Sequence, residues 1–121
     1  TILLVEDEDA VRLFCGRALR NKGYRVIEAA DGDAALAVVN AALAAGEKID
    51  LVLSDVIMPG MDGPTLVQLL RQEIPGVKVI LMSGYAEDAA RAIESDASLN
   101  FLPKPFSLAG LAGKVKEVMK G

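Results

Sequence analysis

The chain contains no histidine, no tryptophan and only one cysteine, and aromatic residues make up 4% of its 121 residues. Without histidine, it can neither use a histidine-based acid–base mechanism nor donate a phosphoryl group from phosphohistidine. A single cysteine excludes an internal disulfide, so a reducing, cytoplasmic setting is the simplest interpretation. Cys15 falls on the apolar stripe of an expected helix, and we therefore expect it to fill the core and not to act in redox chemistry.

Long apolar runs and clusters of basic residues are also missing. No segment approaches the length of a membrane span and no signal-peptide pattern is present, so we expect no membrane contact by this domain. The net charge is −4 and the basic residues are scattered, which argues against direct nucleic-acid binding. Hydrophobic residues make up 52% of the chain, enough for the core of a single domain over residues 1–121. Because Thr1 stands directly before an expected strand, we expect an excised piece of a longer protein, compatible with a membrane anchor elsewhere in that protein.

Short apolar runs of strand length alternate along the chain with segments of helical period. The runs predict five strands, over residues 2–5, 24–27, 51–53, 77–82 and 99–102. A helix is expected after each strand, and the one over residues 86–93 is shorter and weaker than the others. Such alternation predicts an α/β fold with a five-stranded parallel sheet and helices on both faces. If the strand order is 2-1-3-4-5, strands one and three are neighbours.

Local signals predict where some of the helices begin and which residues they bury. Asp33 is expected to cap the second helix, which Gly46 ends, and Pro64 suits the first turn of the third helix. The apolar stripe of the first helix is predicted to contain Val11, Phe14, Cys15, Ala18 and Leu19. That of the last helix is predicted to contain Leu108, Leu111, Val115 and Val118.

Charged and polar residues follow the expected strands. Glu6 and Asp7 come after the first strand, Asp55 after the third, Ser83 after the fourth and Lys104 after the fifth. Ligands of open parallel sheets bind at the carboxyl ends of the strands, so we expect these side chains in one pocket. Two unit charges about 4 Å apart repel by roughly 4 kcal/mol at an effective dielectric constant near 20. The carboxylates therefore require compensating charge, which Mg²⁺ and the Lys104 ammonium would supply.

The chemistry of this pocket points to an incoming phosphoryl group. Neither GxGxxG nor GxxxxGK[ST] is present, and the acidic first loop would repel a phosphate that arrives without a metal. With Mg²⁺ in the pocket, Asp55 can attack a phosphoryl group and form an acyl phosphate. Lys104 and the Ser83 hydroxyl would then stabilise the oxygens that are transferred.

These residues lie in motifs that resemble the receiver domain of two-component response regulators, and the resemblance covers essentially the whole chain. The motifs are LLVEDE (3–8), LVLSDVIMPGMDG (51–63), VILMSGYA (79–86) and FLPKPF (101–106). The resemblance implies a flavodoxin-like receiver fold in which Asp55 is the phosphoacceptor and Asp7 is the principal carboxylate ligand of Mg²⁺. Glu6 would act on the metal largely through water, and the backbone carbonyl of Ile57 would complete the ligand set.

The resemblance also implies a switch and a set of partners. Ser83 would be the switch hydroxyl, Phe101 the switch aromatic, and the Lys104–Pro105 peptide bond would be cis. A histidine kinase or a histidine phosphotransfer protein would donate the phosphoryl group from its phosphohistidine. The module would switch partner interactions or relay the phosphoryl group, and would be an enzyme only in its own phosphorylation and hydrolysis. Apart from the resemblance, Leu13 lies off the apolar stripe of the first helix, and an exposed Leu13 near the acidic edge would contact a helical donor.

More specific similarity concerns the parent protein. The stretches SGYAED (83–88) and NFLPKPFSLAGL (100–111) resemble receivers at the end of hybrid sensor histidine kinases, including the alphaproteobacterial cell-cycle hybrid kinase.

Three other functions share parts of this pattern. A haloacid-dehalogenase-like phosphatase also forms an aspartyl phosphate, but it needs a second aspartate two residues after the nucleophile, where this chain has Ile57. A flavodoxin-like electron carrier needs a hydroxyl-rich loop after the first strand and aromatic residues to stack on flavin. A scaffold receiver that is never phosphorylated remains open, although the presence of Glu6, Asp7, Asp55, Ser83 and Lys104 counts against it.

Overall fold

The computed structural model describes residues 1–84, 87, 91 and 99–120. The strands are β1 (Ile2–Val5), β2 (Val26–Ala29), β3 (Leu51–Asp55), β4 (Lys78–Ser83) and β5 (Asn100–Pro103). The helices are α1 (Asp9–Asn21), α2 (Gly32–Ala44), α3 (Gly63–Glu73) and α5 (Leu108–Lys120). The helix expected over residues 86–93 falls, apart from residues 87 and 91, outside the described residues.

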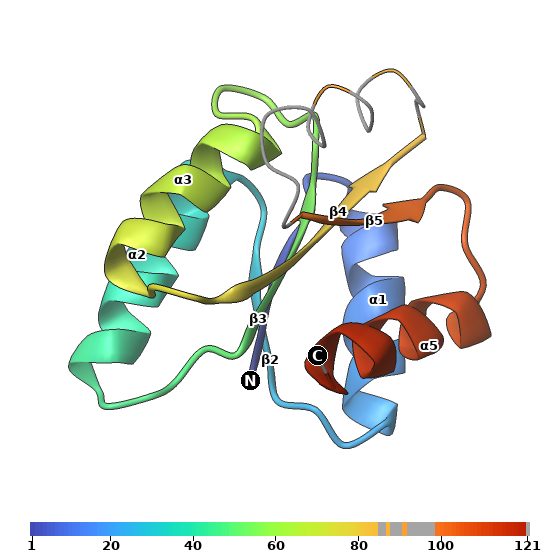
Figure 1. The fold of residues 1–121 in the computed structure, drawn as a ribbon, viewed down its shortest axis with the longest axis horizontal. Helices are drawn as coiled ribbons and strands as arrows, with labels where there is room; N and C mark the ends of the chain where they lie inside the picture. Colours follow the sequence, from blue (N-terminus) through green and yellow to red (C-terminus); the bar gives the residue numbers. More distant parts are fainter. Residues whose placement is uncertain (85–86, 88–90, 92–98, 121) are drawn as a thin grey trace.

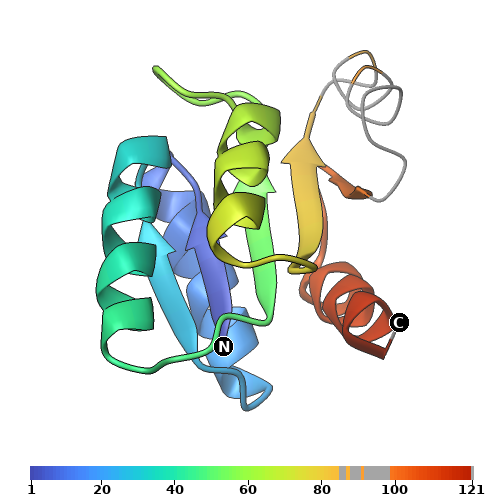
Figure 2. The same cartoon turned by 60° about the vertical axis from the view of Figure 1, so that its left-hand side comes forward.

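The strands form one parallel sheet in the order β2-β1-β3-β4-β5, which confirms the predicted topology. Helices α1 and α5 cover one face of the sheet, and α2 and α3 cover the other (Figures 1 and 2). Because all strands run in the same direction, their carboxyl ends lie at the same edge of the sheet. That edge carries the residues that the sequence singled out.

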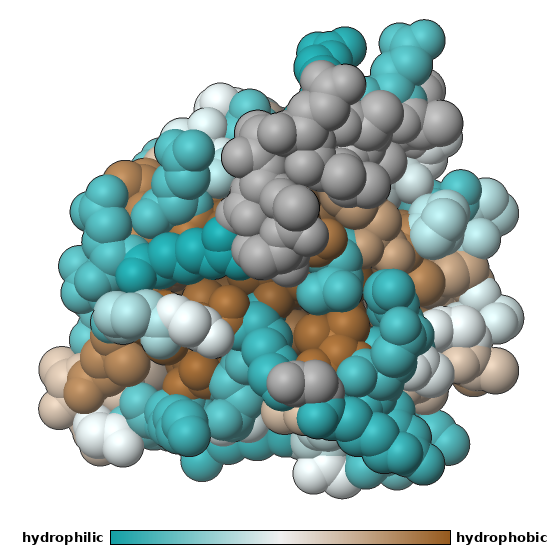
Figure 3. All heavy atoms as spheres, in the orientation of Figure 1, coloured by the Kyte–Doolittle hydropathy of each residue, from teal (hydrophilic) through white to brown (hydrophobic). Residues whose placement is uncertain are grey.

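Each central strand is buried on both faces, which explains its continuous apolar sequence. In β1, Leu3 and Val5 pack into the cluster on the α2 and α3 side, whereas Ile2 and Leu4 pack against α1 and α5. All four side chains are fully buried, and burial of a side chain of this size contributes about 1.5–3 kcal/mol. On the face drawn in Figure 3, apolar atoms appear in patches between polar side chains.

Three strands begin later in the structure than the sequence predicted. The segment expected to start β2 at residue 24 is still part of the turn after α1, because the Tyr24 amide donates a hydrogen bond to the Leu19 carbonyl at 3.2 Å. β2 therefore pairs with β1 from Val26 onward. β4 and β5 are each displaced by one residue in the same direction.

The predicted cap of α2 was wrong by two residues. Asp31, in extended backbone conformation, caps this helix, and its side chain accepts a hydrogen bond from the Ala34 amide at 2.7 Å. Asp33 lies inside the first turn, where its negative charge still suits the helix N-terminus. The end of α2 is as predicted, since Gly46 follows it with a φ of 81°. Pro64 occupies the first turn of α3, also as predicted.

Two of the predicted stripe residues are exposed. Phe14 on α1 is 41% exposed, and Leu108 at the start of α5 is 54% exposed. Cys15 is fully buried, as expected of a core residue, and Leu13 is exposed, as its position off the stripe predicted. Across the described residues, no helix combines the length and apolarity that a membrane crossing needs.

Candidate functional site

The carboxyl edge of the sheet brings together the side chains that were predicted to share a pocket. The backbone fixes this edge through hydrogen bonds between neighbouring strand ends. The Val56 amide donates to the Met82 carbonyl at 3.0 Å, and the Lys104 amide donates to the Ser83 carbonyl at 2.9 Å. The ends of β3, β4 and β5 are therefore held in register where the polar side chains begin.

Three carboxylates meet at the ends of β1 and β3. Glu6, Asp7 and Asp55 each offer one oxygen, and these oxygens lie within 4.8 Å of one another. Glu6 is fully buried and Asp55 is 5% exposed, whereas Asp7 faces solvent. The cluster thus has a buried side and an open side, and its oxygen ligands suit a hard divalent cation.

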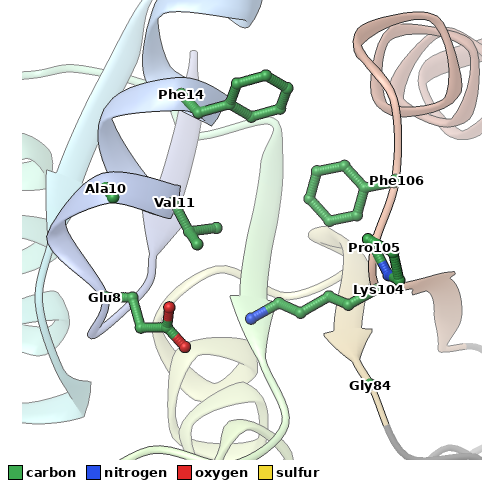
Figure 4. A pocket seen from close by; sticks show the side chains of 8 residues that line it. All are labelled: Glu8, Ala10, Val11, Phe14, Gly84, Lys104, Pro105 and Phe106. Carbon is green, nitrogen blue, oxygen red and sulfur yellow. The ribbon is translucent and has the colours of Figure 1, made fainter.

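Lys104 follows the edge strand β5, and its side chain reaches across to this cluster. Its Nζ lies 2.5 Å from Asp55 Oδ1 and 3.3 Å from Glu6 Oε2. Figure 4 shows the side chain extended from the connection between β5 and α5 toward the end of β3. Desolvation alone would lower the pKa of Lys104, but the hydrogen bond and charge of Asp55, and then those of Glu6, raise it overall. The side chain therefore remains a cation beside the carboxylates. The Lys104–Pro105 peptide bond is cis, as predicted.

Glu6 is the carboxyl group whose ionisation changes most. Burial raises the pKa of Glu6 to about 8, with further contributions from a hydrogen bond to Asp55 and from the Asp55 charge, while Lys104 opposes them. The Glu6 carboxyl therefore keeps its proton to a higher pH than an ordinary glutamate does, beside the Asp55 carboxylate. The proton on Glu6 and the Lys104 ammonium together compensate the negative charge of the clustered carboxylates.

The raised pKa of Glu6 predicts that the metal-free domain loses stability as the pH rises. Because the pKa of Glu6 in the folded state is above its ordinary value of 4.5, the associated stabilisation is complete below about pH 4.5 and is lost through about pH 8. We expect the free energy of unfolding to fall by at least 1 kcal/mol over this range, since one pKa unit corresponds to about 1.4 kcal/mol. Urea unfolding in chelator, at a series of pH values, measures this loss.

Glu6→Gln provides the control for that titration, because the amide cannot ionise. The unfolding free energy of this variant should be flatter with pH than that of the wild type. Among the described residues, the other shifted groups are Cys15, Asp50 and Lys104, and their pKa values lie outside this range or move away from it. A pH profile that is identical in wild type and Glu6→Gln would contradict the assignment.

A pocket of about 450 Å³ opens above Asp55. It is lined by the exposed acids of the first loop, the ends of β3 and β4, and the lysine: Asp7, Glu8, Asp55, Ile57, Met82, Ser83, Gly84 and Lys104. Glu6 lies buried behind the residues that line this pocket. Ile57 is 59% exposed and has an apolar side chain at the pocket wall.

Phe101 is a predicted site residue that the structure places away from both the acidic cluster and this pocket. It lies on β5, opposite Leu81 of β4, and packs partly buried against the core on the α2 and α3 side. Its environment is therefore a core boundary and not a polar site.

Two residues at the site were not identified from the sequence. Arg12 on α1 donates a hydrogen bond from Nη1 to the Glu6 carbonyl at 2.7 Å. Gly63, the first residue of α3, lies so close to the end of β3 that a Cβ atom would stand 2.2 Å from the Asp55 carbonyl oxygen. The signal for Gly63 was present in the motif MDG after Asp55, but the reason for a glycine there is a tertiary contact.

Comparison with known proteins decides the family. The family described as response regulator receiver domain matches residues 2–116 of the chain. The chain belongs to this family. A receiver domain is the phosphoacceptor module of two-component signalling, so the function implied by the sequence motifs is confirmed at this level.

Relatives of this receiver domain include a sensor kinase and a sporulation phosphotransferase. The chain is 54% identical to the sensor kinase CckA of Brucella abortus (strain 2308) over 121 residues, which are 99% of this chain and 12% of that protein. It is 30% identical to the sporulation initiation phosphotransferase F of Bacillus subtilis (strain 168) over 119 residues, covering 98% of this chain and 92% of that protein. The chain thus spans about an eighth of the length of the Brucella kinase.

Solved structures agree with this placement. The crystal structure of the receiver domain from the hybrid histidine kinase CckA matches with a TM-score of 0.81 and 43% identity, over 98% of this chain and 97% of that one. The predicted similarity to receivers of hybrid kinases is therefore confirmed. Neither a haloacid-dehalogenase-like phosphatase nor a scaffold that is never phosphorylated is favoured by these matches.

Proposed function

We propose that residues 1–121 form a single receiver domain in which Asp55 accepts a phosphoryl group from a phosphohistidine. The donor is a histidine kinase or a histidine phosphotransfer protein. The observation that carries this proposal is the Asp55 carboxylate itself, which lies beside an open pocket, 2.5 Å from the Lys104 ammonium and next to two further acids. This arrangement supports a nucleophile with charge compensation already in place.

The metal that accompanies the transfer is proposed to be Mg²⁺. The acidic cluster offers only oxygen ligands, and its exposed side leaves room for water and phosphoryl oxygens, as Mg²⁺ prefers. Asp7 would be the principal carboxylate ligand, Glu6 would act largely through water, and the Ile57 carbonyl would complete the set with Asp55. Bound Mg²⁺ would supply positive charge for the phosphoryl oxygens.

Asp55, Lys104 and Ser83 each have a proposed role in this phosphoryl transfer. An oxygen of Asp55 attacks phosphorus, the phosphorus–nitrogen bond of the donor breaks, and its electron pair stays with the imidazole nitrogen. Lys104 offsets the charge of the new acyl phosphate, because it already contacts the Asp55 carboxylate. Ser83 lines the pocket and offers its hydroxyl to a phosphoryl oxygen.

Ser83 and Phe101 are proposed to convert phosphorylation into a change of surface. The end of β4 is tied to the end of β5 by the hydrogen bond from the Lys104 amide to the Ser83 carbonyl. A movement of Ser83 toward the phosphoryl group would therefore be transmitted to β5, where Phe101 is only partly buried against the core. Such a shift alters partner interactions by favouring one of two conformations.

The donor is proposed to dock on α1. A groove of about 530 Å³ runs between α1 and the connection from β5 to α5, and it is mostly apolar (Figure 4). Phe14 on one side and Phe106 on the other have ring centroids 6.5 Å apart. Leu13 is 50% exposed on the same helix. Exposed apolar side chains beside a charged site suit a helical partner that presents its phosphohistidine over Asp55.

Substitution of Leu13 by Ala tests this function through the donor. We expect Leu13→Ala to slow phosphotransfer from the cognate histidine domain about tenfold, as loss of a buried interface anchor commonly costs about 1–2 kcal/mol. Phosphorylation by acetyl phosphate should be nearly unchanged, because a small molecule needs no docking surface. Rates of radiolabel transfer from the two donors provide the comparison.

Leu108→Ala is the matched control, since Leu108 is similarly exposed and lies near the other end of α1, beside Ala18 and Lys22. It should affect both donors little. Equal slowing with both donors in Leu13→Ala would indicate a folding defect and contradict docking at Leu13. No transfer from either donor to the wild type would contradict the proposed function as a whole.

A further inference from the structure

Arg12 makes an unusual set of contacts beside the acidic cluster. Its Nη1 donates to the Glu6 carbonyl at 2.7 Å, and its Nη2 lies 2.5 Å from Asp9 Oδ1. Its Nε lies 3.7 Å from Glu28 Oε1 on β2. The side chain is 19% exposed. A guanidinium holds several acceptors in one rigid plane, which an ammonium on a flexible stem cannot do.

The Glu6 carbonyl is a sensitive place for such a contact. Glu6 is the first residue after β1, and its amide donates to the Ala29 carbonyl at the end of β2, at 3.1 Å. Its carbonyl belongs to the peptide group that leads into Asp7. The Glu6 amide is thus held by β2 and the Glu6 carbonyl by Arg12. Glu28 in turn pairs Arg12 with β2.

We propose that Arg12 is a positioning residue for the acidic cluster. By fixing the Glu6–Asp7 peptide group, it sets the direction from which the Glu6 and Asp7 carboxylates approach Asp55. The proposal deepens the proposed function, on which it rests for the choice of Mg²⁺ as the probe. It assigns a role to a residue that offers no ligand to the metal itself.

Arg20 shows what Arg12 does beyond pairing with Glu28. Arg20 lies on the same helix, and its Nη2 is 2.8 Å from Glu28 Oε2, but its other hydrogen bond goes to the Val26 carbonyl and not to Glu6. Gly16 makes room for this pair, because a Cβ atom there would lie 3.2 Å from Arg20 Nη1 and from Glu28 Oε2. The two arginines therefore have the same charge, lie on the same helix and both pair with Glu28. They differ because only Arg12 contacts the Glu6 carbonyl.

The sign of the effect separates positioning from simple electrostatics. A cation near three carboxylates opposes the binding of a second cation, so removal of its charge alone would strengthen Mg²⁺ binding. If Arg12 positions the carboxylates, its removal should instead weaken Mg²⁺ binding. We expect Arg12→Ala to weaken Mg²⁺ binding about tenfold. This is the lower end of the loss of affinity that follows removal of a group that orients metal ligands. Arg20→Ala should leave the affinity within about twofold of the wild type, or tighter.

Mg²⁺ titrations followed by amide chemical shifts test this, with thermal melts in chelator alongside. In the metal-free protein, the Asp7 amide resonance should shift in Arg12→Ala and stay in place in Arg20→Ala. Arg12→Lys keeps the charge but has a single nitrogen in place of three nitrogens spread over a plane, so its Mg²⁺ affinity should fall between those of Arg12→Ala and the wild type. It also serves as the test if Arg12→Ala fails to fold.

An Mg²⁺ affinity at or above that of the wild type in Arg12→Ala, or in Arg12→Lys when only that variant folds, would overturn the positioning role and leave the proposed function intact. Equal weakening in Arg12→Ala and Arg20→Ala would overturn it as well, since Arg20 does not touch Glu6. A wild type that binds no Mg²⁺ would instead overturn the proposed metal site.

Discussion

Substituting Ala for Gly63 is expected to destabilise the domain by about 3 kcal/mol, because the added methyl group overlaps rigid backbone. A Cβ atom at this position would stand 2.2 Å from the Asp55 carbonyl oxygen and 3.1 Å from the Val56 Cα. The Gly63 amide also donates to the Val56 carbonyl at 2.7 Å, so the start of α3 cannot move away without losing that hydrogen bond. The strand end that carries Asp55 must shift instead. Urea unfolding measures the loss.

Gly113→Ala is the matched control for this substitution. Gly113 also lies in a helix, on α5, but a Cβ atom there would meet nothing within 4 Å. Alanine should therefore stabilise the domain by roughly 0.5–1 kcal/mol through its higher helix propensity. If Gly63→Ala were as stable as the wild type, the close approach of α3 to the end of β3 would be wrong.

The parallel sheet with helices on both faces could be predicted because the alternation of strands and helices is visible in the periodicity. Apolar runs such as Ile2–Val5 alternate with helical stripes, and this is sufficient for a parallel sheet covered on both faces. The position of a helix cap was less certain, since DGD offers two acids at the start of α2. Which acid caps the helix depends on the backbone that leads into it, and Asp31 has the extended conformation that a cap needs.

The exposure of two residues of the predicted helical stripes could not be predicted from spacing. Phe14 and Leu108 have the period of their stripes, but each lies where no further element covers it among the described residues. Phe14 meets Phe106 from a distant segment instead of the sheet. A helical stripe fixes the face of a helix, whereas the extent to which that face is covered depends on tertiary neighbours.

The members of the candidate site could be predicted because parallel strands end at one edge. Their differences could not. Glu6 and Asp7 are adjacent acids, yet one is fully buried and the other is exposed. The proton that Glu6 retains near neutral pH follows from that burial and from its contact with Asp55, neither of which is visible in the sequence. The roles of Arg12 and Gly63 likewise depend on contacts between segments.

Replacement of Asp55 by Asn has the largest expected effect on function, because the proposed mechanism has no other nucleophile. The amide would keep the size of the side chain while losing both the attacking carboxylate oxygen and the charge that Lys104 contacts. We expect Asp55→Asn to bind no detectable beryllofluoride, a mimic of the phosphoryl group, in the presence of Mg²⁺. Asp33→Asn removes one acid from an exposed position on α2 and should bind like the wild type.

An amide chemical-shift titration with beryllofluoride and Mg²⁺ tests whether Asp55 is the phosphoacceptor. The wild type should bind one equivalent, only with Mg²⁺, with shifts that begin at Asp55 and Ser83 and extend to Phe101. Binding should be lost in Asp55→Asn and kept in Asp33→Asn. Equal binding by Asp55→Asn and the wild type would rule out Asp55 as the phosphoacceptor, and binding by the wild type that needs no metal would rule out the proposed role of Mg²⁺.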